Sequence, residues 1–132
     1  MPVYNTSEQL YQCLKLLFTR LDEVYPSASQ KVASSHLVMR MRLREPSAEV
    51  LIDGRSNPVK IGFGPSTIRP DLELNLTADA LHNILLGKLN LKKAIGSGSL
   101  SFRGPVWKSF VMEDIFRRGQ ILYPDILREC NV

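Results

Sequence analysis

The most regular pattern of hydrophobic and polar positions runs from residue 70 to residue 105. Within Leu72–Leu76, leucines alternate with polar residues, which is the two-residue period of a half-buried strand. Thr77 can cap a helix, and Gly87 suits the left-handed position that ends one. The pattern therefore predicts a strand followed directly by a helix over residues 77–86.

A second short helix and a further strand are expected after this helix. Asn90 can cap the short helix and Gly96 can end it. Leu100 and Phe102 then alternate with serine and arginine, which favours a strand with one apolar face. Because about twenty helical residues separate the two strands, they have room for a parallel crossover.

The N-terminal part of the chain predicts a long amphipathic helix over residues 7–25. Residues 6–9 have the form of a capping box, and Pro26 ends the helix. Its apolar stripe consists of Leu10, Leu14, Leu17, Leu21 and Val24. Such a stripe usually packs on a core, and the alternative of a helix on a membrane surface finds only a thin basic face here. Residues 27–35 are expected to form a polar connection.

Three strands are predicted next, at residues 37–44, 49–53 and 59–63. Their short connections favour antiparallel pairing of neighbours. The first strand has one apolar face and one face with arginines, Arg40, Arg42 and Arg44. Acidic residues on neighbouring strands can pair with them, namely Glu49, Asp53 and Glu73. We therefore expect a solvated, partly paired face and no nucleic-acid binding.

After Pro105 the sequence predicts a helical segment that is broken near residues 113–114 and ends at residues 117–119. A last short helix is expected from Asp125 to Glu129. Taken in order, the elements predict an α+β fold with the arrangement α-β(3)-crossover-β-α-β. We expect a five-stranded mixed sheet that is covered by helices on one face and wet on the other.

The length of 132 residues and the apolar share of 44% indicate one globular domain, residues 1–132. No apolar run approaches the roughly 18 residues of a membrane span, and the N-terminus lacks the pattern of a signal peptide, so we expect a cytoplasmic protein. The net charge of +4 leaves open transient contact with anionic membrane surfaces. Cys13 is expected to be a small core residue, with a disulfide to Cys130 as the less favoured alternative.

The sequence offers little that points to catalysis. His36 and His82 lack a cysteine or carboxylate at metal-ligand spacing, so no metal is expected. Residues 62–64 lack the third glycine and the helix of a dinucleotide loop. Residues 96–98 precede a strand, whereas a phosphate-binding loop precedes a helix. We expect no cofactor, no catalytic residue and no enzymatic activity.

Residues 70–104 resemble the signature of the type-2 sterol carrier protein family, also called non-specific lipid-transfer proteins. The resemblance rests on an ordered series of motifs. These are the alternating strand Leu72–Leu76, the Thr-capped helix Thr77–Leu86, Gly87-Lys88-Leu89, Asn90, Lys93-Ala94 and the segment Gly98–Gly104. The resemblance implies the family fold and a lipid-like ligand in an apolar tunnel between sheet and helices.

By this resemblance the ligand is a fatty acyl, sterol-like or polyketide-like compound that is carried or sequestered without bond chemistry. The residues expected to contact it are apolar and come from the elements predicted after residue 70. They are Leu76, Leu81, Leu85, Leu89, Ile95, Leu100, Phe102, Trp107, Phe110, Met112, Ile115 and Phe116. The chain departs from the family pattern after Pro105, where Trp107 and Phe116 can plug or reshape the tunnel.

Two alternatives to a carrier stay open at the level of the sequence. The apolar groove can instead hold a partner protein or a second copy of the chain, giving a homodimer. The same scaffold can also serve a small accessory enzyme that acts on an apolar substrate, with His82 as the first candidate residue.

Overall fold

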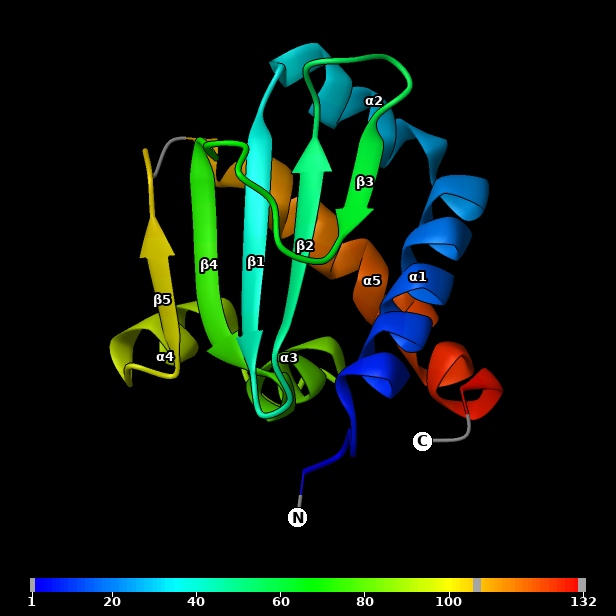
Figure 1. The fold of residues 1–132 in the computed structure, drawn as a ribbon, viewed down its shortest axis with the longest axis vertical. Coiled ribbons are helices and arrows are strands. Elements are labelled where there is room, and N and C mark those ends of the chain that lie inside the picture. The colour runs from blue at the N-terminus through cyan, green and yellow to red at the C-terminus, as the bar shows by residue number, and fades with distance from the viewer. Residues whose placement is uncertain (1, 106–107, 131–132) are drawn as a thin grey trace.

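The computed structural model describes residues 2–105 and 108–130 of the chain. Its helices are α1 (Ser7–Val24), α2 (Pro26–Ser35), α3 (Ala78–Leu85), α4 (Leu91–Gly96) and α5 (Phe110–Glu129). Its strands are β1 (Val38–Arg44), β2 (Ala48–Asp53), β3 (Lys60–Phe63), β4 (Leu72–Thr77) and β5 (Leu100–Arg103). The predicted α+β class is confirmed, and in Figure 1 α5 runs behind the sheet while α1 stands beside β3.

The strands form a five-stranded mixed sheet in the order β3-β2-β1-β4-β5. The predicted antiparallel pairing of the first three strands is confirmed. The prediction that the fourth and fifth strands run parallel is wrong, because the parallel pair is β1 with β4 and β5 is antiparallel to β4. The short helices α3 and α4 stay at one end of the sheet, so the chain re-enters the sheet at the end that it left (Figure 1).

The N-terminal helix forms as predicted, and the segment after it does not. The Thr6 side chain accepts a hydrogen bond from the Gln9 amide and so caps α1. The predicted polar connection at residues 27–35 is wrong, since α2 is a helix that begins at Pro26. Proline is preorganised for the first helical position, and Ala28 and Val32, four residues apart, are buried under it.

The C-terminal helix α5 is continuous, although two interruptions were predicted. The expected break at residues 113–114 is wrong because the buried Asp114 carboxylate pairs with arginines one turn further on, Arg117 at 2.6 Å and Arg118 at 3.7 Å. These ion pairs lie along the helix and support it. The expected end at Gly119 is wrong because this glycine packs closely against α3, where an added Cβ would lie 3.3 Å from Leu85.

The helix also continues through Pro124, where a separate short helix was predicted. Proline removes one hydrogen bond within the helix, to the carbonyl of the residue four positions earlier. Tyr123, just before it, and Ile126, two residues after it, are both buried in the core. Their packing against the rest of the fold outweighs the loss of that bond.

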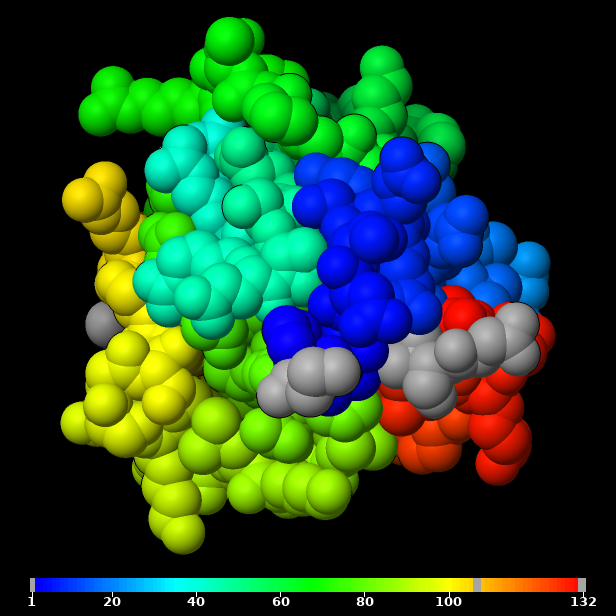
Figure 2. All heavy atoms as spheres, turned by 60° about the horizontal axis from the view of Figure 1, so that its bottom comes forward, coloured from blue at the N-terminus to red at the C-terminus, as the bar shows by residue number. Residues whose placement is uncertain are grey.

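The first and last helices are cross-linked. Cys13 of α1 is buried and forms a disulfide with Cys130, with a Cα–Cα distance of 5.7 Å. The expectation of an unpaired core cysteine is therefore wrong, because the helices run side by side and bring the two thiols together. Arg20 adds an ion pair with Glu129 at 2.8 Å. In Figure 2 the blue N-terminal segment lies against the red end of α5.

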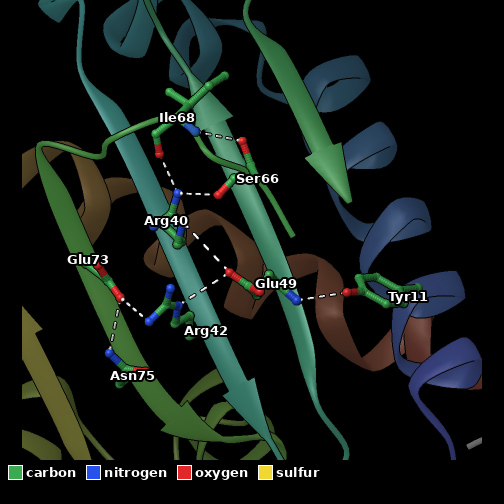
Figure 3. A network of polar contacts seen from close by, with 8 residues as sticks. All are labelled: Tyr11, Arg40, Arg42, Glu49, Ser66, Ile68, Glu73 and Asn75. Carbon is green, nitrogen blue, oxygen red and sulfur yellow. Dashed lines mark hydrogen bonds and ion pairs between the residues drawn. The ribbon is translucent and has the colours of Figure 1, made fainter. Parts of the chain in front are cut away.

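The polar face of the sheet is partly covered by the connection between β3 and β4, residues 64–71, which crosses β2 and β1 (Figure 1). The expectation of a solvated arginine face is wrong for Arg40, which is buried and donates to the carbonyls of Ser66 and Ile68. It is confirmed for Arg42, which is 49% exposed and pairs with Glu49 and Glu73 at 3.3 and 3.4 Å (Figure 3).

The third acidic partner expected for these arginines, Asp53, pairs with Arg55 instead, at 2.8 Å. The hydrogen bonds from Arg55 hold the pKa of the Asp53 carboxyl at about 2, below its ordinary value. Within residues 2–105 and 108–130, no helix is both long and apolar enough to cross a bilayer.

Candidate functional site

Strand register places apolar side chains in three rows across the helix-covered face of the sheet. The first row joins Phe63, Val50, Met41, Leu74 and Phe102. The second joins Ile61, Ile52, Met39 and Leu72. The third joins Ala48, Leu43, Leu76 and Leu100, at the end of the sheet next to α3. The rows differ in how completely the helices above them fill the space.

A cavity of about 50 Å³ lies over the middle of the first two rows. Its walls come from α1, α3, α5 and the central strands, and they are almost wholly apolar. They are Leu14, Leu17, Phe18, Leu21, Met39, Met41, Ile52, Leu72, Leu74, Leu81, Leu85, Met112, Ile115, Phe116 and Gly119, together with Arg40. Among these, Met39, Met41 and Met112 have flexible thioether side chains that adapt to irregular gaps.

Arg40 does not bring its charge into this cavity. Side chains alternate between the two faces of a strand, so Arg40 points away from the face that carries Met39 and Met41. Its guanidinium lies on the polar face, 3.0 Å from the Ser66 carbonyl oxygen and 3.8 Å from Glu49 (Figure 3). The interior of the cavity is therefore suited to hydrocarbon, because a polar guest would lose its hydrogen bonds to water there.

The third row shows no such cavity, since small residues let the elements approach closely. Ala48 stands in the row itself, and Ala78, Ala80 and Ala94 from the neighbouring helices are buried beside it. Over the first two rows, α1 and α5 present large side chains such as Leu17, Phe18 and Phe116. The spacing between packed elements depends on the side chains at their contact, so these large residues favour a wider spacing over the first two rows.

The predicted site residues fall into groups according to this geometry. Five of them are brought together on the cavity wall: Leu81, Leu85, Met112, Ile115 and Phe116. Leu76 and Leu100 are buried in the third row, outside the cavity. Leu89 and Phe102 are partly buried at the margin of the core. Trp107 lies outside the described residues, so its predicted role stays a prediction.

Ile95 and Phe110 lie at the surface, where an interior position was expected. Phe110 is the first residue of α5 and is 59% exposed, because the buried stripe of that helix begins at Val111. Ile95 is 49% exposed, because the short helix α4 buries only Ala94. Whether either residue contacts a ligand stays a prediction.

Eleven cavity residues were not singled out from the sequence as site residues. Most belong to α1 and the central strands, whose apolar positions were recognised as core. The missing information was the pairing of β1 with β4, which places Met39 beside Leu72 and Met41 beside Leu74 under the same helices. The alternation of these residues was visible in the sequence, whereas their position opposite α1 and α5 required the fold.

The histidine that was the first catalytic candidate lies in a different, hydrogen-bonded cluster. Tyr123 of α5 lies 2.7 Å from His82 Nδ1 and 2.7 Å from the Tyr4 hydroxyl. Burial raises the pKa of both tyrosines and lowers the pKa of the His82 imidazole. The cluster thus favours neutral groups that fasten the N-terminal segment to α3 and α5, and none of its residues lines the cavity.

Comparison with protein families assigns the class. The family model described as the SCP-2 sterol transfer family matches residues 18–117. The match covers most of the chain, and the chain belongs to this family. The family is one of lipid and sterol binding or transfer, and in general its members carry their ligand without transforming it. The comparison with curated proteins gave no match.

Solved structures share the fold at low sequence identity. The sterol carrier protein domain 2 of Helicoverpa armigera has a TM-score of 0.69 and 16% identity, over 91% of this chain and 93% of that chain. Sterol Carrier Protein 2 from Yarrowia lipolytica, in its apo form, has a TM-score of 0.63 and 18% identity, over 91% and 96%. The UbiJ-SCP2 ubiquinone synthesis protein has a TM-score of 0.59 and 17% identity, over 92% and 94%.

Proposed function

We propose that this protein binds a hydrophobic small molecule in the cavity between the sheet, α1 and α5, and carries or sequesters it without bond chemistry. The observation that carries the proposal is the apolar wall of that cavity, to which three helices and the central strands contribute. Family membership supports a lipid or sterol as the general class. Fatty acyl, sterol-like and polyketide-like compounds all meet this chemical requirement.

The size of the cavity bears on which of these compounds fits. Its 50 Å³ is about a third of the roughly 150 Å³ of an engineered protein cavity that binds benzene. A long guest must therefore push the walls apart as it enters. A flexible acyl chain can do this stepwise along the methionine-lined floor, whereas a rigid ring system needs the full width at once. We therefore favour an acyl chain.

The energy available from burial is sufficient for useful affinity. Each buried methylene contributes about 0.8 kcal/mol, so ten contribute roughly 8 kcal/mol before the costs of ordering the ligand and widening the cavity. A Kd of about 1 μM needs a net value near 8 kcal/mol, so an acyl chain must bury more than ten methylenes to reach it once these costs are subtracted. No polar contact inside the cavity is needed for capture in this range.

Native mass spectrometry of gently purified protein, combined with uptake of a fluorescent fatty acid, tests the proposal. The informative variant is Met112→Trp, which fills the cavity from α5. Each pair of methylenes displaced costs about 1.6 kcal/mol, or roughly tenfold in Kd. The matched control is Leu127→Trp, on the same helix and outside the cavity wall. A lipid adduct and uptake that only Met112→Trp removes support the proposal, and neither adduct nor uptake in the unsubstituted protein contradicts it.

The setting in which the protein works is part of the same proposal. We infer transient contact with anionic membranes from the net charge of +4, as a route for loading and release. The cytoplasmic location expected from the sequence stays a prediction, and the Cys13–Cys130 disulfide is more typical of an oxidising compartment. Thiol labelling of protein trapped directly from cells distinguishes the two settings. Light scattering over a concentration series tests the predicted homodimer.

A further inference from the structure

A groove in the surface lies beside the cavity, where the second half of α1 and the start of α2 face β3. Its volume is about 490 Å³. The rim carries mixed charges and polar groups, and the floor is apolar. The rim residues include Lys15, Asp22, Glu23, Gln30 and Asn57, and the floor residues are Phe18, Val59, Ile61 and Phe63.

A smaller void of about 20 Å³ lies between this groove and the cavity. It shares Ile52 and Ile115 with the cavity, and Val59 and Ile61 with the groove. Among the described residues, Phe18 is the one side chain that borders all three spaces. On the path from the groove through the smaller void to the cavity, the Phe18 ring separates the interior from the surface.

The floor of this route is continuous and apolar. Ile61 on the edge strand β3 pairs with Ile52 on β2, and Ile52 pairs with Met39 on β1. The second row of the sheet therefore leads from the groove to the cavity without a polar side chain. A hydrocarbon chain moving along it exchanges one apolar contact for the next.

Phe18 is a buried residue that is held by apolar contacts alone. Its ring meets the Phe63 ring edge-on, with 6.2 Å between centroids, and has no hydrogen bond to lose. β3 is an edge strand whose only neighbour in the sheet is β2. The first half of α1 is fastened to β2, where the Tyr11 hydroxyl accepts from the Glu49 amide at 2.9 Å. The second half is tied to α5 by the Arg20–Glu129 ion pair at 2.8 Å. Because such a partly exposed pair contributes little, the second half can still move away from β3 about the fixed point at Tyr11.

The opposite wall of the cavity is closed more firmly. A second groove, of about 600 Å³ between α4 and α5, shares only Phe116 with the cavity. There the Gln120 amide donates to the Ile84 carbonyl at 2.9 Å, and Gly119 packs against Leu85. Opening that wall would break a hydrogen bond and separate closely packed helices.

We propose that Phe18 is the gate of the ligand site and that the groove between α1 and β3 is its mouth. This inference rests on the proposed function. The apolar chain of the ligand enters past Phe18, and its polar end stays at the rim of the groove in contact with water. The mouth thus selects amphiphiles with one flexible apolar chain.

Stopped-flow binding of cis-parinaric acid, a naturally fluorescent long-chain fatty acid, tests the gate. Phe18→Ala removes the ring and is expected to raise the association rate about tenfold, because a conformational step no longer limits entry. Phe116→Ala is the matched control, since both rings are buried and both line the cavity. Its association rate should rise less than that of Phe18→Ala, because the Gln120–Ile84 hydrogen bond and the packing of Gly119 on Leu85 keep that wall closed.

Phe63→Ala gives an independent test that does not alter the cavity wall. Phe63 supports the Phe18 ring from the groove side and does not line the cavity. Association and dissociation should therefore accelerate together, by a similar factor, with Kd nearly unchanged. This signature distinguishes an opened gate from a damaged binding site, and it remains measurable if Phe18→Ala does not fold.

The outcomes separate the gate from the function on which it rests. If the unsubstituted protein takes up the probe and Phe116→Ala is the variant that accelerates association, the ligand enters through the α4–α5 side. The assignment of Phe18 as the gate is then wrong. Unchanged rates in both Phe18→Ala and Phe63→Ala also overturn it. If none of the proteins takes up the probe, the proposed function fails first and the gate with it.

Discussion

The two ends of the helix-covered sheet face differ in how they are filled. Next to α3, the row from Ala48 to Leu100 is closed by small residues that let the helices approach. Over Met39, Met41 and Leu74, the long helices α1 and α5 leave a cavity. The same alternation of apolar residues runs through both ends, so it is the size of the opposing side chains that separates a solid core from a site.

The largest expected effect comes from truncating two leucines of β4, one in the filled row and one beside the cavity. Leu76 is fully buried in the filled row, and Leu74 borders the cavity. Leu76→Ala should lower the free energy of unfolding by about 4 kcal/mol, and Leu74→Ala by about 2–3 kcal/mol, because Leu74 already lacks partner atoms on one side. Urea unfolding of both variants measures the difference. Equal losses, or a larger loss for Leu74→Ala, would contradict the comparison.

The next largest effect is expected from removing the disulfide between α1 and α5, the long helices that cover the cavity. Cys130→Ser removes the disulfide to Cys13 and should cost about 2–4 kcal/mol of stability. Dithiothreitol should shift the thermal midpoint of the unsubstituted protein in the same direction and leave that of Cys130→Ser unchanged. If dithiothreitol leaves the thermal midpoint of the unsubstituted protein unchanged, the stabilising cross-link between α1 and α5 is contradicted.

The polar side of the sheet allows a third comparison, directly behind the cavity. Arg40 is buried and donates to two carbonyl groups, whereas Arg42 is half exposed and pairs with the carboxylates of Glu49 and Glu73. Arg40→Met should cost about 2–3 kcal/mol because it leaves two partly buried carbonyls without their donor, and Arg42→Met at most about 1 kcal/mol. Chemical denaturation of the two variants measures both losses of stability. Similar small losses would show that the 64–71 connection does not depend on Arg40.

The smallest effect is a pH dependence confined to the filled end. His82 accepts a hydrogen bond from buried Tyr123 when its Nδ1 is unprotonated, and burial lowers its pKa below the ordinary 6.5. The unfolded chain then binds a proton more readily, so stability is complete above pH 6.5 and falls as the pH decreases toward the folded pKa. His82→Gln should flatten this slope in unfolding curves recorded from pH 7.5 to 5. An unchanged slope assigns the dependence to another group.

Some of these features could be predicted from the sequence, and others could not. The capped helix after β4 and its apolar side follow from local rules. Five of the predicted site residues, including Leu81 of α3 and Phe116 of α5, do line the cavity. The pairing of β1 with β4 depends on the path of residues 64–71, which buried contacts to Arg40 fix. A pattern shows that an arginine is present, but it does not show which carbonyl groups it meets.

The cavity itself is harder to predict from sequence patterns. Leu14, Leu17 and Met41 are recognisable as apolar from their spacing alone. They border empty space because there is a difference between the distance from the helices to the sheet and the depth that the side chains fill. This difference is set by residues far apart in the chain, such as Cys13 and Cys130, that fix where α1 lies against α5.

The claim on which the account depends is that the hollow end opens wide enough for a guest. A crystal structure grown in the presence of palmitic acid measures this directly. The account predicts continuous elongated density that contacts Met39, Met41 and Leu74, with α1 displaced from β3 and the filled row unchanged. A structure in which these side chains still close the interior, with the fatty acid absent or bound only at the surface, would contradict it.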